Sequence, residues 1–317
     1  MFADVGKKSM WNNKNDIKSM PIDFVSVKEY ASRNGLSERT VRNYCAVGRI
    51  EGAVLIGKTW SIPADAVVKA KTRSSTSNAL LKALREQMEM GLKGGIYHRT
   101  QVDLTYNSNH IEGSRLTRDQ TRFIFETNTI GITDKTVRVD DILETVNHFR
   151  CIDHIILHAE ERLTEGLIKQ LHGMLKSGTS DSRKSWFMVG DYKKLPNEVG
   201  GIETASPKDA HRQIKALLKE YNDSKQHTFD EILDFHYRFE VIHPFQDGNG
   251  RVGRLIMFKE CLRNAIVPFI ITEEQRDFYY RGLQQWTHVQ GYLRDTCLAA
   301  QDEYKQLLNY FKIKYKE

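Results

Sequence analysis

The stretch from His243 to Arg254 constrains this chain more than any other part of its sequence. It reads His-Pro-Phe-Gln-Asp-Gly-Asn-Gly-Arg-Val-Gly-Arg. Pro244 disfavours helical geometry at the residue before it, so a helix is expected to end there. The apolar run Val252–Leu262 predicts a buried helix that begins near Gly250. The string therefore predicts a tight loop between two helices, with a glycine-rich turn at the N-terminus of the second.

The side chains of this loop indicate phosphate chemistry. Backbone N–H groups of a glycine-rich turn at a helix N-terminus can converge on an anion. Arg251 and Arg254 share one face of the same first turn, where the helix dipole disfavours positive charge, and a polyphosphate would satisfy both. Asp247 would repel that ligand unless a cation such as Mg²⁺ lay between them. His243 titrates near neutrality and can take a proton from an attacking hydroxyl.

The string resembles the signature of the Fic family, and every position that the signature specifies is present. The resemblance implies protein AMPylation, in which a Ser, Thr or Tyr hydroxyl of a target protein attacks the α-phosphate of ATP. It implies that His243 is the base and that Asp247 holds the metal. The further implied roles are phosphate binding by Gly248, Asn249, Gly250 and Arg251, contact of Arg254 with the γ-phosphate, and anchoring of the loop by Phe245.

A second motif lies in the segment 97–112, which predicts a helix ending before Gly113. Ser108 and Glu112 lie one helical turn apart and face the same way. Together with Gly113 they resemble the inhibitory motif of the family's N-terminally inhibited class. That resemblance implies that Glu112 pairs with Arg254 and keeps the γ-phosphate from binding productively, so the isolated chain is expected to be mostly inactive.

Residues 22–68 predict a small separate domain. Ser26 and Glu29 have capping-box spacing for a short helix that ends at Gly35, and a second helix is expected between Ser37 and Gly48. Strands are expected at 53–56 and 59–62. The whole resembles winged helix-turn-helix domains of the excisionase and MerR type, which bind DNA. The implied DNA contacts on the second helix are Arg39, Thr40, Arg42 and Asn43.

Two further segments resemble parts of the Fic fold. The helical pattern breaks between Ser185 and Ile202, which resembles the family's hairpin flap, where an exposed edge binds the target by strand addition. The implied flap residues are Gly190, Tyr192 and Lys193. The segment 276–283 resembles the element near the adenine, with Tyr280 as the implied contact. Gly282 replaces the usual alanine there.

The expected fold is mainly α: a helical Fic-type core with a β-hairpin flap, preceded by the small winged domain. Helical patterns run through most of residues 80–317, which form the expected Fic domain with its inhibitory helix at about 97–112. Residues 1–21 are expected to be a flexible lead-in. Residues 69–79, basic and rich in Ser and Thr, are expected to be a linker.

Composition limits the partners without choosing among them. The net charge of +6 permits nucleotide or nucleic-acid binding without requiring it. Four scattered cysteines without metal-finger spacing indicate reduced thiols in a cytoplasmic protein, and no apolar run approaches the length of a membrane span. The expected partners are ATP with Mg²⁺, a target protein, DNA through residues 22–68 and, as an option, a second copy of the chain. No membrane partner is expected.

Two alternative functions remain open at this point. The same residues would serve the removal of AMP from a modified protein, with Glu112 placing a water. A DNA-bound regulator whose Fic-type site senses nucleotide would also use both domains, although a sensor does not need His243.

Overall fold

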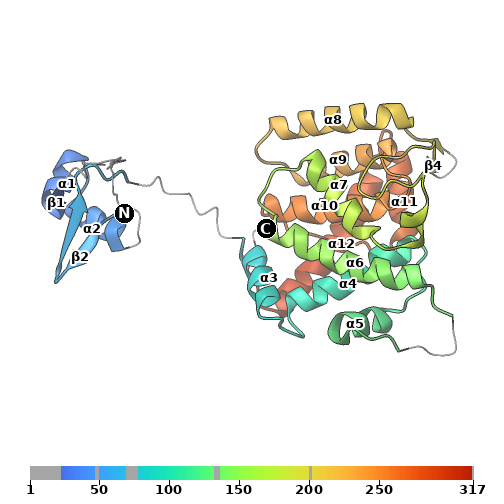
Figure 1. Cartoon of the computed structure of the whole chain (residues 1–317), viewed down its shortest axis with the longest axis horizontal. Helices are drawn as coiled ribbons and strands as arrows, with labels where there is room; N and C mark the ends of the chain where they lie inside the picture. Colours follow the sequence, from blue (N-terminus) through green and yellow to red (C-terminus); the bar gives the residue numbers. More distant parts are fainter. Residues whose placement is uncertain (1–22, 47–49, 69–77, 132–135, 200–201, 316–317) are drawn as a thin grey trace, which may run out of the picture. The chain divides into compact units, whose positions relative to one another are not determined.

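The computed structural model describes residues 23–46, 50–68, 78–131, 136–199 and 202–315. They fall into two compact units, which belong to Met1–Ser75 and Thr76–Glu317. The expected lead-in and most of the expected linker lie outside the described residues. The two units are drawn in Figure 1, and each is described below by itself.

The smaller unit contains two helices and a three-stranded antiparallel sheet in the order β1-β3-β2. Its core gathers apolar side chains from β1, β3 and both helices, including the fully buried Tyr30, Val41 and Ile62. The Ser26 hydroxyl caps α1 by accepting from the backbone of Glu29. The elements are β1 (Phe24–Ser26), α1 (Val27–Arg33), α2 (Glu38–Ala46), β2 (Val54–Ile56) and β3 (Thr59–Pro63).

The sequence predicted both helices and both later strands of this unit, and these are confirmed. Strand β1 was not predicted. It pairs with β3 along Phe24–Ser26, so that its one buried side chain, Val25, faces Ile62. A strand of three residues has too little alternation to be read from sequence.

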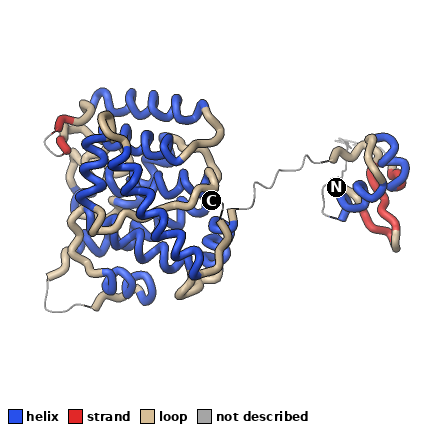
Figure 2. The backbone as a smooth tube through the Cα atoms, turned by 180° about the vertical axis from the view of Figure 1, so that it is seen from behind, coloured by secondary structure: helices blue, strands red, loops and turns tan. Residues whose placement is uncertain are grey.

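The larger unit is built almost entirely from helices, which confirms the predicted fold class (Figure 2). Polar N-caps begin several of them, including a capping box of Thr117 with Gln120 and another of Thr228 with Glu231. The helices are α3 (Ala79–Glu89), α4 (Ile96–Ile111), α5 (Arg118–Thr127), α6 (Val139–Leu157), α7 (Glu165–Leu175), the 3₁₀ helix η1 (Ser180–Arg183), α8 (Pro207–Asp223), α9 (Phe229–Ile242), α10 (Asn249–Arg263), α11 (Arg276–Gln285) and α12 (Gly291–Tyr310).

Helix α10 lies in the interior of the larger unit, with α8 at one edge and α5 at the opposite edge (Figure 1). It is buried on all sides: apart from Gly250 and Arg263, all of its residues are buried. Helices α4, α6, α7 and α9 pack around it. The loop between α9 and α10 leads directly into this central helix. The packed core around α10 therefore holds the backbone of the loop in place.

The only strands described in the larger unit are β4 (Glu198–Val199) and β5 (Ile202–Glu203), which form a short antiparallel hairpin. The hairpin lies later than the sequence predicted. Residues 185–197 form turns instead of a first strand, because Phe187 and Tyr192 turn inward and are buried in the core.

None of the described helices combines the length and the apolar character that crossing a lipid bilayer requires. All four cysteines are buried and unpaired.

Candidate functional site

His243 ends α9 in a conformation that is uncommon for a residue with a side chain. Its φ is +49°, and such a conformation costs roughly 1–3 kcal/mol. Its backbone N–H donates to the Phe239 carbonyl at 2.9 Å. Pro244 follows and cannot continue the helix. The chain therefore turns sharply at this point and holds the imidazole at the end of α9, as the sequence predicted.

The loop after His243 is anchored by Phe245, which is fully buried. Its ring stacks on His172 of α7 with the ring centres 4.0 Å apart and also contacts Tyr192. The Asn249 side chain closes the loop by accepting from the Phe245 N–H and donating to the Phe245 carbonyl, each at 2.8 Å. The side chain of Asn249 is therefore engaged within the loop, and only its backbone amide is left for the phosphate role expected of it.

Two glycines of the loop are required by geometry. Gly248 has φ of +82° and precedes the first turn of α10. At Gly250 the limit is space, because a Cβ atom there would lie 2.3 Å from Oε1 of Glu112 and 3.0 Å from Arg254. The glycine-rich turn thus sits at the N-terminus of a long buried helix, which is the geometry of an anion site, and Glu112 reaches over it.

The surroundings of His243 keep its imidazole neutral. Burial lowers the pKa of His243 to about 4, although a hydrogen bond with the Glu240 carbonyl opposes the shift. That bond joins Nδ1 to the carbonyl oxygen at 3.3 Å. An acceptor at this position favours the tautomer with hydrogen on Nδ1, which leaves Nε2 as the base.

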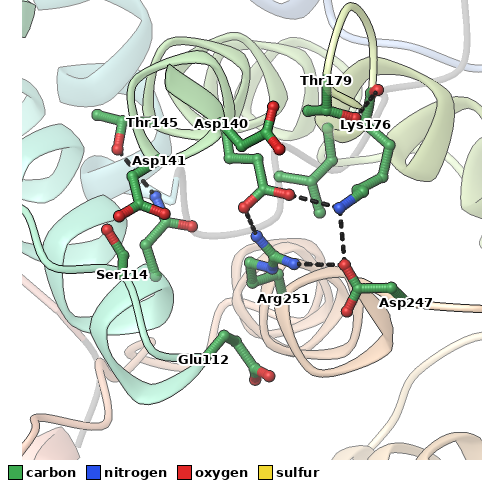
Figure 3. A network of polar contacts seen from close by, with 12 residues as sticks. Glu112, Ser114, Asp140, Asp141, Thr145, Lys176, Thr179, Asp247 and Arg251 are labelled. Atoms are coloured by element: carbon green, nitrogen blue, oxygen red, sulfur yellow. Dashed lines mark hydrogen bonds and ion pairs between the residues drawn. The ribbon is translucent and has the colours of Figure 1, made fainter. Parts of the chain in front are cut away.

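Asp247 belongs to a network of charges around the buried Lys176 and Arg251 (Figure 3). Its Oδ2 accepts from Lys176 at 2.7 Å and from Arg251 at 3.2 Å. Lys176 also pairs with Glu144 and with Asp181, and Glu144 forms an ion pair with Arg251. Burial alone would raise the pKa of Asp247, but Arg251 and Lys176 hold it well below its usual range. Asp247 is therefore a carboxylate at any physiological pH.

The donor set fits a metal that is shared with nucleotide. Among the described residues no group of three or more His, Cys, Asp or Glu side chains could hold an ion. Asp247 is nevertheless 48% exposed, and Mg²⁺ often binds through one carboxylate together with substrate phosphates. Asp247 alone would thus hold Mg²⁺ weakly, and phosphate oxygens would complete the site.

Arg254 lies one turn along α10 and is held by the end of α4. Its guanidinium donates to Oε1 of Glu112 at 2.6 Å. It also donates to the hydroxyl of Ser108 at 3.0 Å and to the Ser108 carbonyl at 2.9 Å. The structure therefore brings together the three residues of the expected inhibitory contact. The effect of that contact on activity stays a prediction.

The expected flap residues lie elsewhere than the sequence suggested. Tyr192 and Lys193 are buried, and Gly190 has φ of +77° and packs against Gly173 of α7. Their side chains are unavailable to a docked target. The exposed hairpin is formed instead by β4 and β5, where Glu198 and Val199 face solvent. This corrects the position of the flap; its docking role remains a prediction.

Tyr280 lies on α11 and is 37% exposed. It is adjacent to Tyr279, which is buried and whose ring centre lies 6.0 Å from the Arg254 guanidinium. Burial raises the pKa of Tyr280 to about 12, and Glu112 contributes to the shift. Tyr280 therefore lies on the Arg254 side of the site. Its contact with adenine stays a prediction.

The residues predicted to contact DNA lie on α2 of the smaller unit. Arg39 and Arg42 are exposed, and Arg42 pairs with Glu38 of the same helix at 2.7 Å. The Thr40 hydroxyl forms a hydrogen bond with Ser37. The side chain of Asn43 lies outside what the structure describes. Two exposed arginines on one helix permit DNA contact, which stays a prediction.

Sequence reasoning missed Glu144, Lys176 and Glu240. Glu144 lies within α6 and Lys176 caps the end of α7, and each has the sequence context of an ordinary helix residue. Glu240 lies one turn before His243, and burial raises its pKa to about 8. Only its position in the motif-bearing helix could have drawn attention to it.

Comparison with known proteins agrees with this geometry. Residues 162–261 match the sequence model of the Fic/DOC family. The chain is 28% identical over 190 residues to the protein adenylyltransferase Fic of Nematostella vectensis, which covers 58% of this chain and 42% of the relative. It is 28% identical over 183 residues to the protein adenylyltransferase Fic-1 of Caenorhabditis elegans, which covers 56% and 35%. The chain thus spans less than half the length of these curated relatives.

Solved structures share the fold of the larger part of the chain. A Fic domain containing signaling protein from Bacteroides thetaiotaomicron superposes with a TM-score of 0.54 and 27% identity, covering 74% of this chain and 91% of the other. Fic-1 of C. elegans gives a TM-score of 0.56 at 18% identity, covering 75% and 74%. The segment that matches the Fic/DOC family thus contains the loop described above, and the chain has protein adenylyltransferases among its relatives.

Proposed function

We propose that this chain is an autoinhibited protein AMPylator. In the proposed reaction a Ser, Thr or Tyr hydroxyl of a target protein attacks the α-phosphorus of ATP. A bond forms between the hydroxyl oxygen and that phosphorus, the bond from the α-phosphorus to the bridging oxygen breaks, and pyrophosphate leaves. The observation that supports the proposal most strongly is the Fic loop itself, with a buried neutral His243 beside a glycine-rich helix N-terminus and two arginines.

His243 has the position and the protonation state of the base. Its Nε2 is neutral at physiological pH because burial lowers its pKa. The phosphates of bound ATP would raise that pKa, since nearby negative charge favours the imidazolium. The imidazolium that forms when the target proton arrives would keep its Nδ1–H bond to the Glu240 carbonyl. His243 thus accepts the proton while its ring stays oriented.

The loop backbone and Arg251 stabilise the phosphates. The amides at Gly248 to Gly250 lie at the N-terminus of α10, where partial positive charge accumulates. Arg251 points from the first turn of the same helix into the charge network with Asp247 (Figure 3). Asp247 would hold Mg²⁺, which supplies neutralisation of phosphate charge when bound. These groups are in place before ATP arrives, so little reorganisation is needed.

Glu112 is proposed to keep this site inactive. It takes the Arg254 guanidinium that a γ-phosphate would need, and it occupies the space over Gly250. Holding a two-state site about 99% inactive requires roughly 2.7 kcal/mol, half of the change that inverts such a population. Breaking one buried ion pair can cost about 3–5 kcal/mol. The single contact between Glu112 and Arg254 therefore has sufficient strength for the inhibition.

The test is AMP transfer from labelled ATP by the Glu112→Gly variant, with the chain itself and a cell lysate as targets. We expect about a hundredfold more transfer than in the wild type, because Arg254 and the space over Gly250 become free. Glu112→Gln keeps the bulk without the charge, and its rate of AMP transfer should be intermediate.

Adding His243→Ala to Glu112→Gly should abolish transfer while ATP binding remains. Equal transfer by the wild type and Glu112→Gly would contradict the inhibition, and full transfer without His243 would contradict the mechanism.

The remaining expectations are part of the same proposal. AMP removal by the same residues would appear as loss of label when an AMPylated target is incubated with the wild-type chain and magnesium. DNA binding by the smaller unit would appear as an electrophoretic shift that Arg39→Ala abolishes. Cytoplasmic location and homodimer formation stay predictions.

A further inference from the structure

Lys193 is a buried lysine with an unusual set of partners. Its side chain is 3% exposed. The amine donates to Oδ1 of Asn197 at 2.6 Å and to the hydroxyl of Thr204 at 2.6 Å. Asn197 immediately precedes β4 and Thr204 immediately follows β5. One ammonium group therefore joins the two residues at the base of the hairpin.

The same amine also reaches the residue before the proposed base, donating to the Ile242 carbonyl at 3.4 Å. The backbone N–H of Lys193 donates to the Pro244 carbonyl at 2.9 Å. Lys193 thus contacts the residues on both sides of His243. These two bonds hold a turn whose central residue has a costly positive φ.

Its neighbours strengthen the same connection. The Asn197 amide donates to the Phe245 carbonyl at 2.9 Å, and the backbone N–H of Leu195 donates to the Gln246 side chain at 3.2 Å. The segment that leads into the hairpin is therefore hydrogen-bonded to four of the five residues of the loop from 242 to 246. A hairpin with two-residue strands has little stability of its own and depends on such contacts.

Keeping an ammonium group at this buried position costs free energy. Burying an ammonium without a charged partner is unfavourable, and the three side-chain acceptors of Lys193 are all neutral oxygens. Burial accordingly lowers the pKa of Lys193 to about 8. Only a side chain with several donors at its end can bridge three oxygens from three separate backbone segments.

We infer that Lys193 is a positioning residue that couples the β4–β5 hairpin to the backbone of the His243 loop. Its consequence for catalysis rests on the proposed function and on the predicted docking of a target segment on the exposed hairpin. Occupation of the hairpin then restrains Asn197 and Thr204, and through the amine and the backbone N–H of Lys193 it restrains the carbonyls on either side of His243. A small error in that position is costly, because the base must meet the target hydroxyl at hydrogen-bond distance.

The coupling is tested first without any activity. Hydrogen–deuterium exchange is measured on the full chain for Lys193→Met, which keeps the length of the stem and removes the donors. We expect exchange about tenfold faster in peptides covering 239–247 and 197–204 together. Lys194→Met is the matched control, because Lys194 is the adjacent residue and is exposed. Faster exchange in the hairpin alone, with the loop unchanged, would overturn the coupling.

A kinetic test then separates positioning from general destabilisation. In the Glu112→Gly background, Lys193→Met should lower kcat about tenfold or more while KM for ATP stays within about twofold. Lys193→Arg keeps a donor at the end of the chain and should recover part of the loss, whereas Lys194→Met should show none. Thr204→Val removes one acceptor at the base of the hairpin and should give a smaller loss in the same direction, which keeps the test valid if Lys193→Met folds poorly.

The two proposals fail differently. If Glu112→Gly transfers no AMP, the proposed function fails, and the coupling is then decided by the exchange measurement alone. If Glu112→Gly is active and Lys193→Met retains its full kcat, the coupling has no catalytic role and the inference is wrong.

Discussion

Arg251 and Arg254 lie one turn apart on the same buried helix, and each is held by a glutamate from a different helix. Glu144 holds Arg251 from within α6, is 13% exposed, and also binds Lys176. Glu112 holds Arg254 from the C-cap position that follows α4, is 26% exposed, and has Arg254 as its ion-pair partner in the described part of the chain.

These differences in position and exposure indicate that Glu144 has a structural role, whereas Glu112 can be released from Arg254. Removing Glu144 would leave the buried cations Arg251 and Lys176 with less compensating charge, so its contact is required for the folded site. Glu112 sits at a helix end, where a small shift of the last turn could withdraw it from Arg254. The pairs Glu144–Arg251 and Glu112–Arg254 join the same residue types, but they are expected to have opposite effects on activity.

The strongest test of this comparison neutralises each glutamate in turn. Glu144→Gln should lower the free energy of unfolding by about 3 kcal/mol, since it leaves Arg251 and Lys176 undercompensated, and it should not raise AMP transfer. Glu112→Gln should raise transfer, and it should lower the free energy of unfolding by less than Glu144→Gln does, because the Glu112 carboxylate is nearer to solvent. Denaturant unfolding and a labelled-ATP assay measure the two quantities. Activation by Glu144→Gln would show that both arginines are gated in the same way.

Lowering the pH should destabilise the core around Arg251 and Arg254. Burial lowers the pKa of His148 and of His236 to about 3, and Arg254 contributes to both shifts. A histidine whose pKa is lower in the folded state binds its proton mainly in the unfolded state. As the pH falls from about 6.5 toward about 3, proton binding therefore favours the unfolded state, and the folded protein loses stability. Each should therefore cost roughly 2 kcal/mol at pH 5 relative to pH 7.

The measurement is the free energy of unfolding as a function of pH, followed for the wild type and for His236→Gln. The variant should lose less stability between pH 7 and pH 5 than the wild type, since one buried imidazole that resists protonation is gone. The exposed His288 offers the control His288→Gln, which should follow the wild-type curve. Identical slopes for His236→Gln and the wild type would show that His236 does not resist protonation.

The smallest effect concerns the space that Glu112 shares with Gly250. A Cβ at this position would lie 2.3 Å from Oε1 of Glu112, so Gly250→Ala should cost about 1 kcal/mol in the wild type and displace the carboxylate. In a Glu112→Gly background the same change should cost much less. A double-mutant cycle on unfolding free energies measures the coupling. Additive effects would mean that Glu112 does not occupy the space over the glycine turn.

Much of the fold followed from local signals. Ser26 begins the helix that its capping-box spacing predicted, and Pro244 ends α9 where expected. The hairpin was placed too early, because Phe187 and Tyr192 have the side chains of strand residues but are used to pack the core. Alternation of residue types cannot distinguish a strand from a buried irregular segment, since both bury apolar side chains.

The sequence by itself determined the chemistry of the loop. A histidine before a proline, an acid and glycines at a helix start form a contiguous string, so short-range geometry places them together whatever surrounds them. The tertiary structure decided which other charged residues interact with the loop. Glu144, Lys176, Glu112 and Lys193 come from separate segments, and only packing around α10 brings their charges to the loop. The strength of such contacts depends on burial, which no local pattern in the sequence records.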